Sequence, residues 1–143
     1  MPYRYLDELS FADIGFQARG GSLEDCFASA WEATLEVMVR SCARLEEKVG
    51  REIALEAPAL DLLLFELLQK LIYFKDAERL FLNLKSLRID GRKGGYKLEG
   101  WAVGTRIDPA RQELGLDVKA VTLHRFALKP TAKGWQATVI LDV

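Results

Sequence analysis

The second half of the chain constrains the fold most. There, four segments alternate apolar and polar side chains and follow one another closely. A glycine-rich stretch at 91–95 separates the first two, and Lys133-Gly134 marks a turn before the last. Strands joined by short turns pair in antiparallel fashion, because a parallel pair needs a long crossover. The sequence therefore predicts consecutive hairpins built from residues 80–89, 96–108, 114–129 and 134–142.

Two segments earlier in the chain carry apolar residues at helical spacing. The first begins at Ser22, with Asp25 placed three residues on as in a capping box, and should run into the charged segment before Gly50. The second covers 59–75. Short strands are expected at 2–8, 11–19 and 51–57. We therefore expect one domain over residues 1–143 with an α+β fold: a sandwich of two helices packed on a mostly antiparallel β-sheet.

Composition narrows the classes of partner. Half of the residues are hydrophobic and 29% are charged, which is typical of a globular protein. The formal net charge is −1, which disfavours strong direct binding of nucleic acid. The most apolar stretch, 60–74, is interrupted by charged residues such as Asp61 and Lys70, so no membrane span is expected.

Cys26 and Cys42 both fall on the apolar side of the first predicted helix. Their separation along a helix, roughly 24 Å, is far beyond the reach of a disulfide. We expect two reduced core thiols, as is usual for a cytoplasmic protein. The opening Met1-Pro-Tyr-Arg4 is not followed by the apolar segment of a signal peptide.

Standard catalytic motifs are absent from the sequence. It contains no G-x-S-x-G, no phosphate loop, no G-x-G-x-x-G and no C-x-x-C. With His124 as its single histidine, a metal site built from several histidines is excluded. The glycines and basic residues at 91–95 join two predicted strands, so they indicate a hairpin turn.

The acidic residues Asp13 and Asp142 are the candidates for a metal site. Asp142 precedes Val143 and its carboxylate, and the strand expected at 134–142 would hold both in place. Asp13 interrupts a strand-like segment, where aspartate is disfavoured unless it caps, turns or binds something. Oxygen ligands alone would suit Ca²⁺, Mg²⁺ or Mn²⁺. From these residues alone, solvated strand ends are the simpler interpretation.

His124 and Lys119 lie in the third alternating segment. Period-two alternation places His124 on one face with Val118 and Phe126, where a lone histidine is usually a hydrogen-bonded core residue. Lys119 falls on the opposite face. There it is either a solvated charge or a contact for an acidic partner.

Several stretches together resemble the archease family, whose members assist the GTP-dependent RtcB-type RNA-splicing ligase. These stretches follow in order along nearly the whole chain: Ala12-Asp-Ile-Gly15, Gly21-Ser-Leu-Glu-Asp-Cys-Phe27, Asp61-Leu-Leu-Leu-Phe-Glu-Leu-Leu68, Val118-Lys-Ala-Val-Thr-Leu-His124 and Gly134-Trp135 leading to Leu141-Asp-Val143.

The resemblance implies an α+β fold and a role as an activator that is not itself an enzyme. Such an activator promotes guanylylation of the ligase and its multiple turnover in tRNA splicing and RNA repair. The resemblance further implies that Asp13, Asp142 and the Val143 carboxylate bind a divalent metal (Ca²⁺, Mg²⁺ or Mn²⁺). It makes Lys119 and His124 candidates for a role beside that site, in contact with the ligase or the ligands.

The sequence departs from the family pattern at two places. Ser10-Phe11 stands where the family commonly has His-Thr, and Gln112 stands where it commonly has histidine. Both replacements remove polar groups that could orient metal ligands. A change in metal affinity, metal preference or the ligase contact is therefore expected.

Two other classes of function are compatible with the residues. A metal-dependent enzyme acting on a small phosphorylated substrate would need a roomy pocket near Asp13 and Asp142, with a base such as His124. A chaperone-like binding module would need a wide exposed apolar patch. The apolar residues are assigned to core faces, so the second alternative ranks last.

Overall fold

The structure is a computed structural model that describes residues 2–7 and 12–143. Its elements, in chain order, are β1 (Tyr3–Tyr5), β2 (Asp13–Gly20), α1 (Leu23–Met38), the short 3₁₀ helix η1 (Cys42–Arg44), β3 (Val49–Ala57), α2 (Leu60–Glu78), β4 (Leu80–Arg92), β5 (Gly95–Arg106), β6 (Ala120–Thr131) and β7 (Gly134–Asp142).

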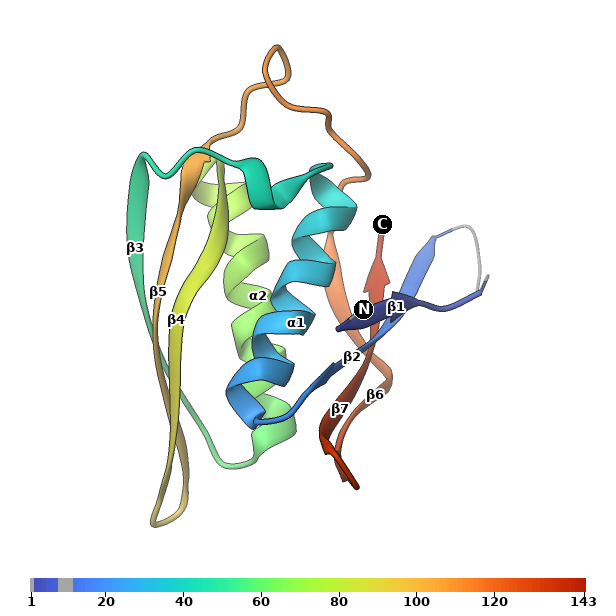
Figure 1. The fold of residues 1–143 in the computed structure, drawn as a ribbon, viewed down its shortest axis with the longest axis vertical. Coiled ribbons are helices and arrows are strands. Elements are labelled where there is room, and N and C mark those ends of the chain that lie inside the picture. The colour runs from blue at the N-terminus through green and yellow to red at the C-terminus, as the bar shows by residue number, and fades with distance from the viewer. Residues whose placement is uncertain (1, 8–11) are drawn as a thin grey trace.

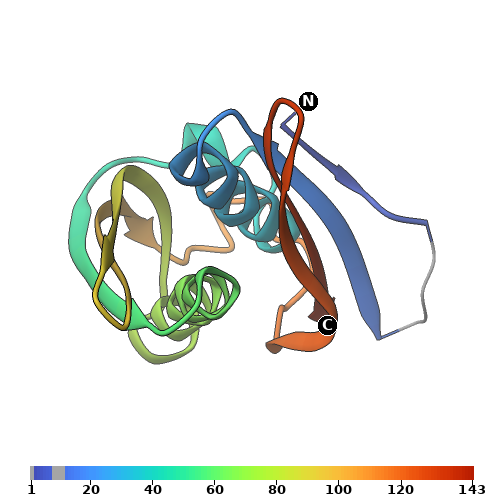
Figure 2. The same ribbon diagram turned by 90° about the horizontal axis from the view of Figure 1, so that it is seen from below.

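The strands form two separate antiparallel sheets with both helices between them (Figure 1). One sheet has four strands in the order β1-β2-β7-β6, and the other has three in the order β3-β5-β4. Seen from below, the helices lie between the two sheets (Figure 2). Each helix contacts strands of both sheets, since α1 packs on β2 and β4 while α2 packs on β6 and β4. The predicted α+β class is confirmed, with two sheets covering the helices from opposite sides.

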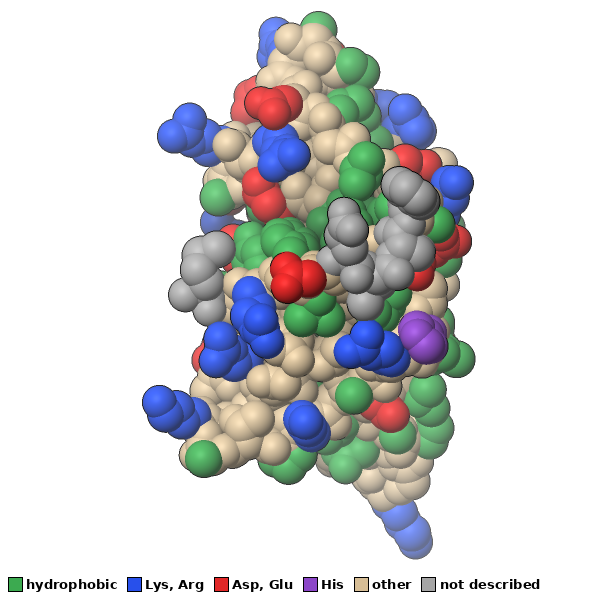
Figure 3. Space-filling view, turned by 90° about the vertical axis from the view of Figure 1, so that its right-hand side faces the viewer, with side chains coloured by type: hydrophobic (Ala, Val, Ile, Leu, Met, Phe, Trp, Pro, Cys, Tyr) green, Lys and Arg blue, Asp and Glu red, His purple; other side chains and the backbone are tan. Residues whose placement is uncertain are grey.

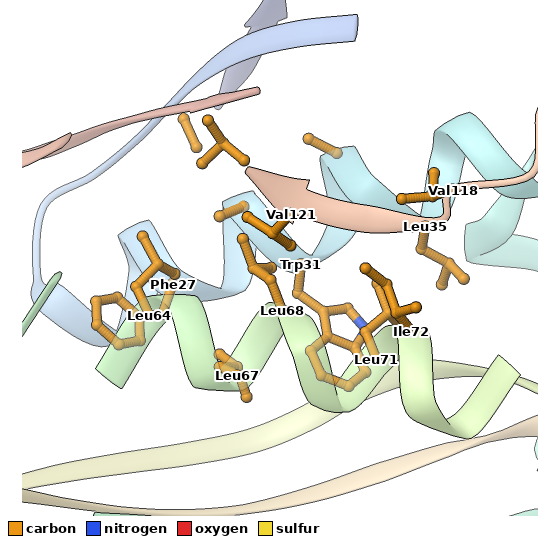
Figure 4. Close-up of a cluster of buried hydrophobic side chains, with 14 of the residues drawn as sticks. Phe27, Trp31, Leu35, Leu64, Leu67, Leu68, Leu71, Ile72, Val118 and Val121 are labelled. Atoms are coloured by element: carbon orange, nitrogen blue, oxygen red, sulfur yellow. The ribbon is translucent and has the colours of Figure 1, made fainter. Parts of the chain in front are cut away.

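The core lies between the helices and the two sheets. Trp31 from α1 is buried there, and its indole N–H donates a hydrogen bond to the carbonyl of Leu82 in β4 (2.8 Å). Figure 4 shows how side chains from both helices and β6 converge. Burial of this apolar surface is the main force that holds the two sheets to the helices. The labelled cluster consists of Phe27, Trp31, Leu35, Leu64, Leu67, Leu68, Leu71, Ile72, Val118 and Val121.

The first helix begins as predicted but ends earlier. The Ser22 side chain accepts a hydrogen bond from the amide of Asp25 (3.0 Å), as an N-cap should. The prediction that this helix continues toward Gly50 is wrong. The helix stops at Met38 because Val39 forms an isolated β-bridge with Leu114 from the loop before β6. Tertiary pairing here overrides local helical spacing.

This early end also corrects the placement of the cysteines. Cys42 lies in η1, outside the helix that carries Cys26. Both are free and buried, so they are core thiols as expected, although the argument from spacing along one helix does not apply.

The third alternating segment differs most from its prediction. A strand was expected from residue 114, but residues 107–119 form the long loop at the upper end of Figure 1, and β6 begins at Ala120. Within β6 the register shifts between Thr122 and Ala127, and Arg125 has a positive φ of 56°. Such a bulge breaks period-two alternation. Across the described residues, no helix is long and apolar enough to cross a membrane.

Candidate functional site

The start of β2 and the end of β7 bring Asp13 and Asp142 together. In the antiparallel register of these strands, Asp13 pairs directly with Asp142. Directly opposed residues project from the same face of a sheet, with Cβ atoms about 4.5–5.5 Å apart. The neighbouring Leu141 is fully buried on the core side, so alternation turns the two carboxylates to the outer face. Two acidic side chains from opposite ends of the sequence thus lie side by side on one face of the sheet.

Hydrogen bonds on both sides hold the end of β7. The amide of Lys119 donates to the carbonyl of Asp142 (2.8 Å), and the amide of Val143 donates to the carbonyl of Ala12 (2.8 Å). The Val143 side chain is packed against the core. Because the backbone on either side of Asp142 is bonded to a neighbouring segment, the carboxylate at Val143 is held beside the two aspartates.

The donor set fits a hard divalent cation. Asp13, Asp142 and Val143 supply carboxylate oxygens only, which are the ligands that Ca²⁺, Mg²⁺ and Mn²⁺ take. On the same face of the sheet, Thr122 pairs with Ile140 in the register that pairs Ala120 with Asp142. The Thr122 hydroxyl is buried and has no hydrogen-bond partner, so a polar group on this face is left for a ligand or water to satisfy.

Within residues 2–7 and 12–143, no three or more His, Cys, Asp or Glu side chains are grouped so that they could hold a metal ion. A metal ion bound here would therefore depend on two aspartates together with a main-chain carboxylate at Val143. It is an incomplete cage, and further oxygens would come from water or from a partner.

His124 and Lys119 are both exposed. The expectation of a core position for His124 is wrong, because the β6 bulge turns this part of the strand out of register. The single histidine, purple in Figure 3, is visible on the side of the molecule that carries the four-stranded sheet. Only Lys119 adjoins the carboxylates, through its amide. His124 lies five residues further along the chain, within the part of β6 where the register shifts.

The two departures from the family pattern have different outcomes. Ser10-Phe11 lies outside the described residues. Gln112 is placed, and its side chain closes a local turn. The side-chain oxygen accepts from the amide of Asp108 (2.9 Å), and the side-chain nitrogen donates to the carbonyl of Arg106 (3.0 Å). Gln112 therefore braces the loop after β5, and its hydrogen bonds do not involve Asp13 or Asp142.

A cavity of about 350 Å³ adjoins Asp13. Asp142 and Val143 do not line it. Gly115 from the loop before β6 lies so close to the end of α1 that a Cβ there would stand 2.1 Å from the carbonyl of Val37. The wall thus combines the strand ends, the last turn of α1 and this loop. The lining residues are Tyr5, Leu6, Asp7, Asp13, Ile14, Gly15, Glu36, Val37, Arg40, Gly115 and Leu116.

This cavity is acidic, because its described lining residues include three carboxylates and one guanidinium. Burial alone would raise the pKa of Glu36. However, hydrogen bonds from Cys42 and from the Ser41 amide, with the positive charge of Arg40, hold that pKa below its usual value. Glu36 therefore stays ionised at neutral pH. The hydroxyl of Tyr5 donates to the carbonyl of Ala33 (2.7 Å), and burial raises the Tyr5 pKa, so it stays neutral.

The sequence analysis did not identify the ion pair that holds the loop before β6, next to the site. Lys75 in α2 is buried and bonds to Asp76 and to Asp117 in the loop before β6. Burial opposes its charge, but the hydrogen bonds to Asp117 and Asp76 raise the Lys75 pKa above its ordinary value. The signal was present in the sequence: Lys75 continues the spacing of Leu68 and Leu71 on the buried face of the helix. A lysine in that pattern needs a paired carboxylate.

Comparison with known proteins places the chain in a family. The profile of the Archease protein family (MTH1598/TM1083) matches residues 3–143. "Protein archease" of Pyrococcus abyssi is 33% identical over 133 residues, covering 92% of this chain and 93% of the relative. "Protein archease" of Methanosarcina barkeri is 33% identical over 142 residues, covering 99% and 95%.

A solved structure has the same fold. The solution structure of Methanobacterium thermoautotrophicum protein 1598 superimposes with a TM-score of 0.85 at 31% identity, covering 99% of both chains. The family profile spans nearly the whole sequence, and the relatives match along almost their full lengths. The chain therefore belongs to the archease family.

Proposed function

We propose that this protein is an accessory activator of an RtcB-type RNA ligase. In this role it promotes guanylylation and multiple turnover of the ligase in tRNA splicing and RNA repair, and it is not an enzyme by itself. The observation that carries the proposal is the register that opposes Asp13 to Asp142, with the Val143 carboxylate held next to them. The link to a ligase comes from what the sequence resemblance implies, and it is supported only insofar as the chain belongs to the archease family.

The proposed site would hold one divalent cation between Asp13, Asp142 and the Val143 carboxylate. Bound there, the cation would supply a concentrated positive charge for phosphate oxygens or carboxylates of the partner. The chain's own contribution is placement. Two paired strands fix the carboxylates before the ligase arrives, so little reorganisation is needed when the two proteins meet. Lys119 and His124, both exposed on β6 or at its start, are candidate contacts for the ligase.

The alternative, an enzyme acting on a small phosphorylated substrate, is less well supported. The cavity beside Asp13 is lined by Asp7, Asp13 and Glu36 against Arg40 alone, a charge balance that repels phosphate. His124 does not line this cavity and so lacks the position of a general base. An acidic surface suits docking to a basic partner better than turnover of an anion. The proposed setting is the cytoplasm, which is compatible with two free, buried cysteines.

The first experiment is multiple-turnover RNA ligation by the cognate ligase with GTP and Mn²⁺, with and without this protein. Wild-type protein should stimulate turnover, whereas Asp13→Asn and Asp142→Asn should not. Asp90→Asn is the matched control. Asp90 is a partly exposed carboxylate paired with Arg88 in β4, on the other sheet, and this variant should stimulate like wild type. Full stimulation by both site variants would disprove the metal-site mechanism.

A second experiment measures the site without the ligase. Calorimetric titration with Ca²⁺ and Mn²⁺ should show binding to wild type that weakens by about tenfold or more in Asp13→Asn and Asp142→Asn, since even outer partners of metal ligands are worth that much. Adding Gly-Ser after Val143 moves the free carboxylate away from the aspartates and should weaken binding as well. The same dipeptide added before Met1 serves as the control. Unchanged affinity after the C-terminal addition would remove Val143 from the ligand set.

A further inference from the structure

A second and larger cavity has a volume of about 540 Å³. Its lining residues come from segments that lie at the upper end of Figure 1. It forms where the segment from the end of α1 through η1 meets the end of β5 and the loop before β6. Its most distinctive feature is a concentration of positive charge from three separate parts of the chain. The cationic lining residues are Arg40, Arg44, Lys48, Arg106 and Arg111.

The acidic residues of the lining do not neutralise this charge. They number three, against five cations: Glu46, Asp108 and Glu113. Glu46 pairs with Lys48 (3.2 Å) and, more loosely, with Arg111 (3.8 Å). Pairs between such exposed side chains are weak and readily exchanged for another anion.

Two arginines remain without a carboxylate. In the described part of the chain, the guanidinium groups of Arg44 and Arg106 have neither an ion pair nor a side-chain hydrogen bond. The chain as a whole carries a net charge of −1, so an excess of two positive charges around one cavity is a local feature that the overall charge conceals. In Figure 3, blue and red side chains lie close together over the upper part of the molecule.

The backbone that carries these arginines is fixed. The amide of Arg40 donates to the carbonyl of Glu113 (2.9 Å), and the amide of Lys48 donates to the carbonyl of Gly104 (2.8 Å). Gln112 bonds to the carbonyl of Arg106, as described above. The backbone segments that carry the cationic side chains are therefore held together by hydrogen bonds. The side chains converge without any loop having to close.

The chemistry of the lining selects a class of ligand. Guanidinium groups offer paired N–H donors that match phosphate oxygens, and they stay charged at all physiological pH values. None of the lining residues is aromatic, so the cavity offers no platform on which a base could stack. The volume lies within the range of small-molecule sites. These features favour recognition of phosphate with little discrimination between bases.

We propose that this cavity binds the phosphate groups of a phosphate-ester ligand. Arg44 and Arg106 make the principal contacts, and Arg40 contributes from the wall shared with the acidic cavity beside Asp13. A free nucleotide and the backbone of single-stranded RNA present the same chemistry. Binding is weak and salt-dependent, because it rests on a few phosphate contacts. The site is separate from the carboxylates of the proposed metal site, and the proposal does not depend on the role with a ligase.

The test is direct binding without ligase or metal. Fluorescence anisotropy of a short labelled oligouridylate, and calorimetry with GTP, are measured at low salt with wild type and with the double variant Arg44→Glu/Arg106→Glu. The double variant loses two charge-assisted contacts, so it should bind at least tenfold more weakly. Binding of wild type should also fall as salt is raised.

The control variant carries the same change of charge at the opposite end. Arg92→Glu/Lys133→Glu alters exposed cations at the tips of the β4–β5 and β6–β7 hairpins, and it should keep wild-type affinity within about twofold if binding is local. Circular dichroism checks that all variants fold. Binding of RNA, of GTP or of both, lost only in the cavity variant, supports the proposal and identifies the source of the phosphate. Equal loss in both variants, or no binding of either ligand to wild type, overturns it.

Discussion

The two sheets of this protein are built in opposite ways. In the three-stranded sheet, β3 pairs with β5 through nine consecutive residue pairs, from Val49–Gly104 to Ala57–Tyr96. β4 and β5 form a local hairpin with one register shift, between Leu84 and Ser86. In the four-stranded sheet, β2 from the start of the chain lies between β1 and β7, and β6 carries a bulge. The three-stranded sheet is a scaffold, whereas the four-stranded sheet joins the start of the chain to its end and presents Asp13 and Asp142. The proposed metal site thus lies where distant segments meet, and the experiments below test this division between the sheets.

The largest expected effect comes from the core that the sheets share. Trp31→Ala should lower the free energy of unfolding by about 3–5 kcal/mol, because it leaves a cavity and an unpaired carbonyl at Leu82. Urea unfolding measures the loss. Trp101→Ala is the control, since this ring is 41% exposed on the three-stranded sheet, and its loss should be clearly smaller. Similar losses in the two variants would mean that the helices do not couple the sheets through Trp31.

The substitution Gly104→Ala should have a smaller effect on stability, and one confined to the three-stranded sheet. In Gly104→Ala, the added Cβ would stand 1.9 Å from the carbonyl oxygen of Phe81, so β4 and β5 must move apart. Overpacking of this kind should cost about 1–3 kcal/mol. In Gly91→Ala the nearest atom would be 3.7 Å away, in the ring of Tyr96, so this control should be nearly neutral. Hydrogen exchange should rise in the three-stranded sheet alone. Weakened Mn²⁺ binding by folded Gly104→Ala would contradict the division.

The Lys75 ion pair should affect stability less than it affects local order. Lys75→Met replaces a buried ion pair by an apolar side chain, so the free energy of unfolding should change by less than about 1.5 kcal/mol. The anchor of the loop at Asp117 is lost, so amide exchange should rise at Val118 to Val121. Unchanged exchange there would show that the pair does not hold the start of β6.

The pH dependence of this pair has a defined sign. The folded-state pKa of Lys75 is raised above its unfolded value, so its contribution to stability is complete below the unfolded pKa of about 10.4. That contribution is lost as the pH rises through the higher folded pKa. The difference in stability between wild type and Lys75→Met should therefore be constant around neutrality and change only in strong alkali. A change between pH 5 and 8 would contradict this assignment.

The smallest expected effect is a difference in alkylation rate between the two cysteines, each of which contacts a different sheet. Cys26 contacts the carbonyl of Ala18 in β2, and the carbonyl of Cys42 accepts from the side chain of Asn83 in β4. Burial raises the pKa of Cys26 to about 11. Burial together with Glu36 raises that of Cys42 to about 12, so both thiols should resist alkylation at pH 8 in the folded protein. In pulsed alkylation under mild denaturant, different rates would show that one sheet opens first. Fast labelling of either thiol without denaturant would refute its burial.

Much of the fold was predictable because local patterns and tertiary structure agree. The cap at Ser22, the second helix and the last hairpin follow from residue type and spacing. The end of α1 was not predictable, because it is set by the pairing of Val39 with Leu114, which are far apart in the sequence. The start of β6 was not predictable either, because the loop before it is held by distant partners, Val39 and Lys75. The exposure of His124 depends on a bulge whose residues carry no distinctive signal.

The candidate site was only partly predictable. Alternation and composition identified Asp13 and Asp142 as unusual, but they could not place them opposite each other, since register depends on the whole sheet. The resemblance to a family supplied that link. The basic cavity was missed for a related reason. Its arginines are spread over residues 40–111, and only the fold brings them together.

The position of β7 in its sheet has a consequence for synthesis on the ribosome. β7 follows every other strand in the sequence, yet it lies between β2 and β6 and supplies the hydrogen-bond partners of both. The three-stranded sheet can pair while the chain is still emerging, because all its strands precede residue 107. Until β7 has emerged, β2 lacks its partner and one side of α1 remains uncovered. A nascent chain therefore passes through a partly folded stage that exposes apolar surface. A chaperone would find the largest apolar binding surface at this stage.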